Sequence, residues 1–187
     1  MTRDRQRILE GAIALVLFGL TIPAANWMIG NVGTVCVPNG PCLVPVWPGI
    51  AAPSGVLMIG LALVLRDIVQ RRLGPAFGVA AILIGTAISA MIAPAAIVTA
   101  SVSAFLLSEL ADFAVYTPLQ RKRFVTAVFA SGVVGLVVDS VVFLYLAFGS
   151  LDFLAGQIIG KIWMILLALP LMHLLRRRDE KLGLVAA

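Results

Sequence analysis

Residues 131–163, SGVVGLVVDSVVFLYLAFGSLDFLAGQIIGKIW, decide the fold of this chain. Two apolar runs meet there at a short loop, and each is long enough for a helix that crosses a lipid bilayer. Each run also carries polar side chains that lipid disfavours: Asp139 in the first, and Gln157 and Lys161 in the second. An ionisable group at bilayer depth costs about 2.5–3.5 kcal/mol on insertion scales. We therefore expect these side chains to face protein or water, and to have a use.

The composition of the whole chain is that of an integral membrane protein. Of its 187 residues, 61% are hydrophobic and 12% are charged, and the mean hydropathy is +1.07. Soluble domains have about 45–50% apolar and about 25% charged residues. We predict an all-α polytopic membrane protein that forms a single integral membrane domain over residues 1–187. Its six transmembrane helices are expected at about residues 8–29, 54–70, 75–91, 95–115, 124–148 and 153–175.

The formal net charge of +5 is explained by topology and lipid headgroups, and a nucleic-acid partner is not expected. All Lys and Arg residues except Lys161 fall in four clusters: Arg3, Arg5 and Arg7; Arg66, Arg71 and Arg72; Arg121, Lys122 and Arg123; and Arg176, Arg177, Arg178 and Lys181. Two apolar spans and an uncharged or acidic loop separate successive clusters. This positive-inside pattern predicts a multi-pass protein of the cell (inner) membrane with both termini in the cytoplasm. The two halves of three helices would then be inverted relative to each other, as in many transporters.

The loop at residues 31–53 is expected on the outer side of the membrane. It contains five prolines, no charged residue and both cysteines, Cys36 and Cys42. Five residues separate the cysteines, and an oxidising compartment would permit a disulfide; the sequence leaves its formation open. The only histidine, His173, belongs to the opposite face of the membrane. No metal site and no cofactor are therefore expected.

Polar and aromatic residues share helix faces with small residues. In the fifth predicted helix Asp139 and Phe143 follow Gly132 and Gly135 on one face. Small residues allow close helix approach, and an acid among them faces the interior. Asn26, near the outer end of the first helix, is either a cap or an amide that lines a cavity. The candidate substrate-binding residues are Asn26, Phe105, Ser108, Glu109, Asp112, Asp139, Phe143, Gln157 and Lys161.

The depths of these residues predict an ion pair. At about 1.5 Å per residue, Lys161 lies roughly 10–12 Å, and Asp139 roughly 13 Å, from the outer ends of their antiparallel helices. A direct Asp139–Lys161 contact is therefore expected, with Glu109 and Asp112 deeper towards the cytoplasm. Two interpretations stay open at this point. The pair either serves a ligand or a proton, or only joins two helices; the two acids either line the inner mouth or cap the fourth helix beside residues 121–123.

The motifs of common enzymes are absent from the sequence. There is one histidine, no Gly-x-Ser-x-Gly, no His-Glu-x-x-His and no glycine-rich phosphate loop. We therefore expect a protein that is not an enzyme. Any direct use of ATP would need another subunit.

Four segments resemble one known family: residues 65–69 through Gly74, residues 108–116, residues 139–143 through 147–149, and Gly156-Gln157 with Lys161. In order, spacing and six-span topology the chain is similar to the vitamin uptake transporter-like family, the queuosine precursor transporters that take up 7-cyano-7-deazaguanine. It departs from the family pattern at Arg71, Leu73, Gly135 and Glu109, which indicates a divergent branch.

The resemblance implies import of a 7-deazaguanine such as preQ0 or preQ1. Carboxylates would accept the N–H donors of this purine-like base, and Lys161 or Gln157 would serve its carbonyl. Phe105, Phe143 or Trp163 would stack on its face. Protons are a candidate coupling ion. The alternatives are a substrate-binding membrane subunit of a vitamin uptake complex and a non-transporting structural protein, and association into a homo-oligomer stays open.

Overall fold

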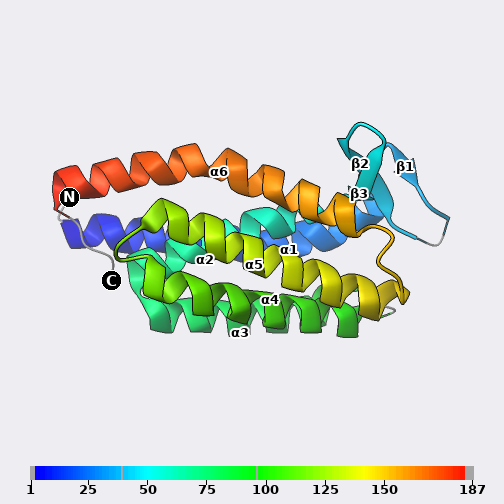
Figure 1. Cartoon of the computed structure of the whole chain (residues 1–187). Helices are drawn as coiled ribbons and strands as arrows, with labels where there is room; N and C mark the ends of the chain where they lie inside the picture. Colours follow the sequence, from blue (N-terminus) through cyan, green and yellow to red (C-terminus); the bar gives the residue numbers. More distant parts are fainter. Residues whose placement is uncertain (1–2, 39, 96, 184–187) are drawn as a thin grey trace.

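The computed structural model describes residues 3–38, 40–95 and 97–183, which form six helices and one three-stranded antiparallel sheet (Figure 1). The helices are α1 (Arg3–Asn31), α2 (Val56–Leu73), α3 (Pro75–Ile92), α4 (Val98–Leu119), α5 (Phe124–Phe148) and α6 (Leu154–Leu182). The sheet lies at one end of the elongated bundle, called here the sheet end. At the opposite end α1 begins, α2 and α6 end and the basic clusters gather, so we call it the basic end.

Among the described residues, five of the six helices are long and apolar enough to cross a membrane, and α2 is the exception. The prediction of six spans is therefore supported for five helices. The 18 residues of α2 include Arg66, Asp67, Arg71 and Arg72, which lower its hydropathy. Their burial explains how this composition is tolerated: all four residues are at most 8% exposed.

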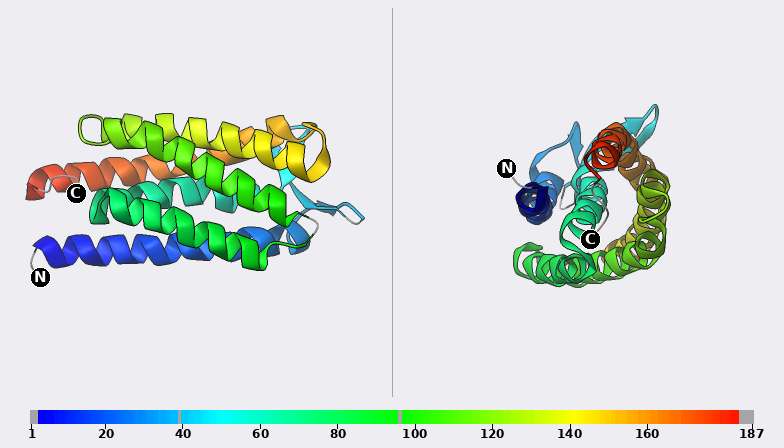
Figure 2. Two further views of the ribbon diagram at one scale, coloured as in Figure 1. Left: turned by 90° about the horizontal axis from the view of Figure 1, so that it is seen from below. Right: turned by 90° about the vertical axis from the view of Figure 1, so that its left-hand side faces the viewer.

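The position of α2 accounts for that burial. It contacts each of the other five helices, and the end-on view in Figure 2 shows it inside an arc formed by α3, α4, α5 and α6. Because the neighbours of α2 are protein, its charged residues can be satisfied by side chains of those helices. The outer helices instead carry their exposed apolar residues towards the surroundings, as expected of a bundle in lipid.

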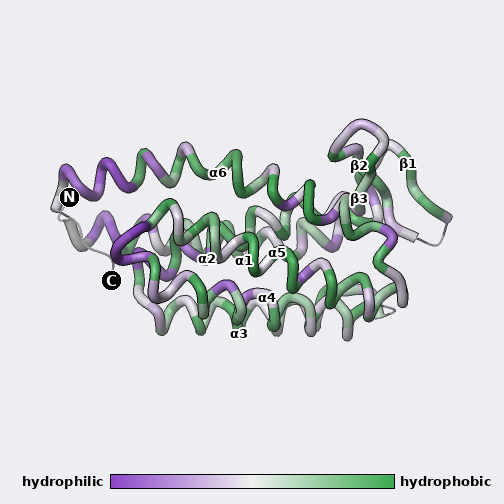
Figure 3. The backbone as a smooth tube through the Cα atoms, viewed as in Figure 1, coloured by the Kyte–Doolittle hydropathy of each residue, from purple (hydrophilic) through white to green (hydrophobic). Residues whose placement is uncertain are grey.

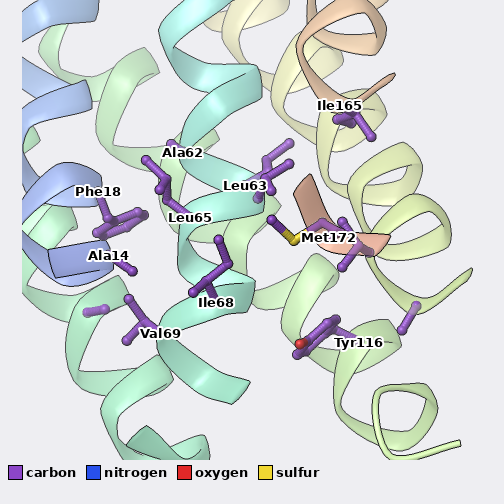
Figure 4. Packing of buried hydrophobic residues seen from close by; sticks show 14 of the residues in the cluster. Ala14, Phe18, Ala62, Leu63, Leu65, Ile68, Val69, Tyr116, Ile165 and Met172 are labelled. Carbon is purple, nitrogen blue, oxygen red and sulfur yellow. The ribbon is translucent and has the colours of Figure 1, made fainter. Parts of the chain in front are cut away.

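The apolar core follows α2 along its length. Figure 4 shows Leu63, Leu65, Ile68 and Val69 of α2 close to residues of α1, α4 and α6, including Phe18, Tyr116, Ile165 and Met172. Gly60 allows α2 to approach α6 closely, because a Cβ at this position would lie 3.0 Å from the backbone of Lys161. The backbone is mainly apolar through the helices and hydrophilic where α1 begins and α6 ends (Figure 3). The close approach at Gly60 sets α2 and α6 side by side at the level of Lys161.

The segment predicted as an outer loop forms the sheet. β2 (Cys42–Trp47) lies between β1 (Val35–Cys36) and β3 (Ile50–Pro53). The five prolines of residues 31–53 argued against strands in the sequence analysis, because a proline in a central strand cannot donate to the ladder. Here β1 pairs with Cys42 and Leu43, so Pro45 lies beyond the paired part of β1, where β2 has a paired strand on one side among the described residues.

A disulfide joins Cys36 and Cys42, which are paired in register across β1 and β2. This resolves the alternative that the sequence left open. The indole of Trp163 in α6 stacks on Trp47, with 6.2 Å between ring centroids, and donates to the carbonyl of Val46 at 3.0 Å. The sheet is thereby fixed to the beginning of α6.

Candidate functional site

A cavity lies in the half of the bundle nearest the sheet. Its empty volume is about 590 Å³, which includes space open to the surroundings. All six helices contribute to its wall, together with the residues around Pro53 and Gly55. The polar lining consists of Asn26, Ser89, Ser101, Asp139, Gln157 and Lys161, and the aromatic lining of Phe105 and Phe143. A mainly apolar cavity with a few converging polar groups is typical of a small-molecule site.

The predicted ion pair between Asp139 and Lys161 is present. Lys161 Nζ donates to Asp139 Oδ2 at 2.5 Å, to Ser140 Oγ at 2.8 Å and to Gln157 Oε1 at 2.7 Å. The ammonium group has three N–H donors, and all three are used. We call Asp139, Ser140, Gln157 and Lys161 the cavity layer. Lys161 is only 1% exposed, and its hydrogen bonds join α6 to Asp139 and Ser140 of α5.

The hydrogen bonds within the cavity layer determine which atoms stay available. Gln157 accepts from Lys161 through its oxygen, so its NH₂ group is the free end of the amide. Asn26 donates its NH₂ to the carbonyl of Ile22 at 3.0 Å, which leaves its side-chain oxygen as an acceptor. Asp139 retains Oδ1, to which no hydrogen bond is made within the described part of the chain. The cavity therefore offers the acceptors of Asp139 and Asn26 and the amide donor of Gln157, beside the hydroxyl groups of Ser89 and Ser101.

Two aromatic residues, Phe105 of α4 and Phe143 of α5, line the cavity. Phe105 of α4 packs against Phe18 of α1, with 6.0 Å between ring centroids. A Cβ at Gly85 of α3 would lie 2.6 Å from the ring of Phe105, so glycine makes room for that ring. Trp163, considered as a stacking residue from the sequence, is 41% exposed and contacts the sheet. It is not among the residues that line the cavity.

Three predicted site residues, Ser108, Glu109 and Asp112, do not line the cavity. Ser108 donates to the carbonyl of Phe105 in its own helix at 3.0 Å. Glu109 Oε2 accepts from Arg66 Nε at 3.0 Å, and Asp112 forms an ion pair with the same guanidinium. The alternative in which both acids cap α4 beside residues 121–123 is therefore wrong, because their cation comes from α2.

Arg66 is the centre of a second polar layer between α2, α4 and α5. Its Nη1 lies 3.0 Å from Asp67 Oδ1 and donates to Gln70 Oε1 at 2.9 Å. Ser131 of α5 donates to Asp67 Oδ2 at 3.3 Å. We call the group formed by Arg66, Asp67, Gln70, Glu109, Asp112 and Ser131 the Arg66 layer. All six side chains are buried.

The sequence interpretation missed Arg66 because it assigned this residue to a basic topology cluster. Arg66 stands ten residues into α2, which is about 15 Å from the start of the helix and well inside a bilayer-sized span. Gln70 follows one turn later on the same face. Depth and spacing could have separated Arg66 from Arg71 and Arg72.

A third layer of ion pairs joins helices at the basic end. Arg71 and Arg72 both contact Asp179 of α6, at 2.8 and 2.9 Å, and Arg72 also contacts Glu10 of α1 at 2.8 Å. Glu10 in turn contacts Arg178 at 2.5 Å. We call these five residues the basic-end layer. The expectation that Arg71 and Arg72 face lipid headgroups is corrected, because acids of α1 and α6 enclose them.

Residues 90–175 match a family model described as "Putative vitamin uptake transporter". The match suggests a transporter. It covers a little under half of the chain and includes α4, α5 and the part of α6 that carries Gln157 and Lys161. No curated protein and no solved structure matches the chain. The matched description names vitamin uptake and no particular compound, and it favours transport over catalysis.

Proposed function

We propose that the protein imports a queuosine precursor, a 7-deazaguanine such as preQ0 or preQ1, across the cell membrane. The observation that carries this proposal is the cavity in the sheet-end half, where acceptors, an amide donor and aromatic rings converge. The family match over residues 90–175 supports transport as the activity. The resemblance of the sequence motifs to queuosine precursor transporters supplies the substrate class.

The free atoms of the cavity suit a deazaguanine. The base presents a ring N–H and an exocyclic NH₂ on one edge, with a carbonyl beside them. Asp139 Oδ1 and the Asn26 oxygen would accept the two donors, and the Gln157 NH₂ would donate to the carbonyl. Phe105 and Phe143 would cover the flat face. A base without these donors would leave a buried acceptor unpaired, which costs about 1–3 kcal/mol.

Six spans with both termini in the cytoplasm complete the proposal. With 18 residues, α2 is about 27 Å long, close to the thickness of a bilayer core. Its charges are enclosed by other helices, so it would cross the membrane without exposing them to lipid. The positive-inside rule then puts the basic end in the cytoplasm and the sheet outside, and the disulfide suits an oxidising exterior. The substrate would enter from the sheet side.

Binding and uptake together test the proposal. We expect 7-cyano-7-deazaguanine to raise the melting temperature of the purified protein more than guanine or common vitamins do. Asp139→Asn and Gln157→Ala should each weaken binding about tenfold or more, equal to at least about 1.4 kcal/mol. Asp152→Asn, in the exposed α5–α6 loop, is the matched control. Unchanged uptake by Asp139→Asn and Lys161→Ala in a strain without de novo synthesis would refute the site.

The family description favours one second candidate, a substrate-binding membrane subunit of a larger vitamin uptake complex. This candidate predicts co-purification with an ATPase module and stabilisation by a vitamin. Absence of stabilisation by deazaguanines, guanine and vitamins alike would instead favour a structural membrane protein.

A further inference from the structure

The Arg66 layer contains more carboxylates than cations. Asp67, Glu109 and Asp112 all contact the single guanidinium of Arg66, and the four residues are at most 1% exposed. With every group ionised, this layer would carry a net charge of −2. Two uncompensated charges in a water-excluded interior are strongly unfavourable, and carboxylates that share a site do not all ionise.

The neighbouring helices do not supply the missing cations within the described residues. The sequence of α3 has no charged residue, and α5 adds Ser131 and, two turns away, Asp139, which already pairs with Lys161 of α6. From α4, Tyr116 donates its hydroxyl to the carbonyl of Asp67 at 3.1 Å and brings no charge. The cavity layer is balanced, and each of the three cations of the basic-end layer contacts one or both of the two acids there, Asp179 and Glu10. The excess negative charge is therefore confined to the Arg66 layer.

The geometry indicates where a proton would reside. Asp67 Oδ1 and Asp112 Oδ1 contact the two terminal nitrogens of the Arg66 guanidinium, Nη1 and Nη2, so the two carboxyl groups are neighbours. Two carboxylates have no hydrogen to share, so a hydrogen bond between them requires one added proton. Asp112 Oδ2 is buried without a hydrogen-bond partner among the described residues, and Asp67 Oδ1 has an ion-pair contact with Arg66 Nη1 but no hydrogen bond there. Buried polar atoms are nearly always paired, and a protonated carboxyl would provide a donor here. Glu109 differs, because its Oε2 accepts from Arg66 Nε and, among the described residues, neither of its oxygens is a buried atom without a hydrogen-bond partner.

We propose that Asp67 and Asp112 share a proton, and that this pair is the site where a coupling proton binds and leaves during import. The inference rests on the proposed function. The proton forms an O–H bond with one carboxyl oxygen and is accepted by the other carboxyl, which brings the charge of the layer from −2 to −1. It arrives from the sheet side and leaves as a hydronium ion or buffer acid on the basic side, with no other bond formed or broken.

The proposed pair is placed to sense the cavity. The side chain of Asp112 packs on Gly135 of α5, one turn or about 6 Å along the helix from Asp139. Binding of a proton in the Arg66 layer would thus reduce the negative field at the carboxylate that faces the substrate. This is a direct electrostatic link between proton and substrate.

A measurement without substrate tests the proton itself. Infrared spectra of the full chain in lipid, at neutral pH, should show the carbonyl band of a buried protonated carboxylic acid that resists exchange with bulk deuterium. The band should be lost in Asp67→Asn and in Asp112→Asn. Glu109→Gln is the matched control from the same layer and should keep it. A spectrum of the wild type without such a band, or a band lost only with Glu109→Gln, would overturn the proposal.

A second measurement tests coupling, with 7-cyano-7-deazaguanine as the probe in proteoliposomes and the membrane potential clamped. An inward gradient of one pH unit supports about tenfold accumulation for one coupled proton. The wild type should accumulate the probe to about this extent. Asp67→Asn and Asp112→Asn should lose accumulation and keep binding and exchange of the probe across the bilayer. Accumulation that needs a sodium gradient and does not depend on pH would overturn the proposal.

A wild type that does not bind the probe refutes the proposed function, whereas the infrared result still decides whether Asp67 and Asp112 share a proton.

Discussion

Lys161 keeps its charge inside the bundle because each ammonium hydrogen has its own acceptor. Desolvating an ammonium ion is expensive, and the nearby Asp139 carboxylate recovers the cost only while the geometry is maintained. The remaining two acceptors are Ser140 of α5 and Gln157 of α6, of which Gln157 lines the cavity. Lys161 is thus best understood as the residue that orients Asp139 and Gln157, whose other atoms stay free for a ligand.

This interpretation predicts strong coupling between Asp139 and Lys161 in stability. Lys161→Met leaves a buried carboxylate without its cation and should lower the free energy of unfolding by about 3–5 kcal/mol. The double variant Asp139→Asn/Lys161→Met removes both charges and should be less destabilised than the sum of its single variants. Denaturant titrations of the purified proteins in detergent, which give the free energy of unfolding of each variant, measure both effects.

The exposed pair Arg176–Glu180 is the matched control for this cycle. Its side chains are 43% and 59% exposed and lie one turn apart on α6. Such surface pairs contribute about 0.2–1 kcal/mol. A Lys161→Met variant that is destabilised no more than Arg176→Met would contradict the role given to Lys161.

At the scale of elements, α3 and α4 determine the shape of the cavity. The ring of Phe105 fits beside Gly85, and its other neighbour is Phe18 of α1. Since the ring is the far end of a flexible side chain, it can turn when Gly85 is enlarged. The space available for this movement is the cavity that Phe105 lines.

Gly85→Val is therefore expected to narrow the cavity. The new side chain would displace the Phe105 ring towards Asp139 and weaken binding of 7-cyano-7-deazaguanine about tenfold or more, equal to about 1.4 kcal/mol. Gly19→Val on α1 is the control, because a Cβ there meets nothing within 4 Å. Binding titrations on both proteins give the comparison. Equal affinities in the two variants would show that Phe105 does not limit the cavity.

The elements also show what the sequence could and could not predict. Long apolar runs predicted the positions of the helices, because the bilayer requires them. The antiparallel order of α5 and α6 predicted the Asp139–Lys161 pair from depth alone. The role of Arg66 was missed because it depends on α2 being central, which no local pattern encodes. The sheet was missed because prolines usually exclude a central strand, whereas Pro45 lies beyond the two residues of β2 that pair with β1.

At the scale of the whole molecule, three polar layers succeed one another along the bundle. The cavity layer lies nearest the sheet, and the Arg66 layer follows it towards the basic end. The basic-end layer comes last and connects α1, α2 and α6. The cavity belongs to the sheet-end half, and ion pairs join the helices at the other end. For a transporter, this arrangement corresponds to a form that is closed on the basic side.

The basic-end layer should then control access from that side. Asp179→Asn removes the acid shared by Arg71 and Arg72 and should favour a form that is open at the basic end. A destabilisation of the closed form by about 1.4 kcal/mol would raise the open population about tenfold. Ala127 on α5 is fully buried near this end, so Ala127→Cys reports opening through its reaction with a membrane-impermeant maleimide.

Inside-out vesicles, which present the basic side outward under the proposed topology, provide the measurement. The Ala127→Cys thiol should react slowly in the parent protein and about tenfold faster when Asp179→Asn is added. Asp152→Asn, near the sheet end, is the control and should leave the rate unchanged. The native cysteines are joined in a disulfide and should not react. Labelling that accelerates only in right-side-out vesicles would show that the topology is the reverse of the one proposed. A rate unaffected by Asp179→Asn would show that the basic-end layer does not close the bundle.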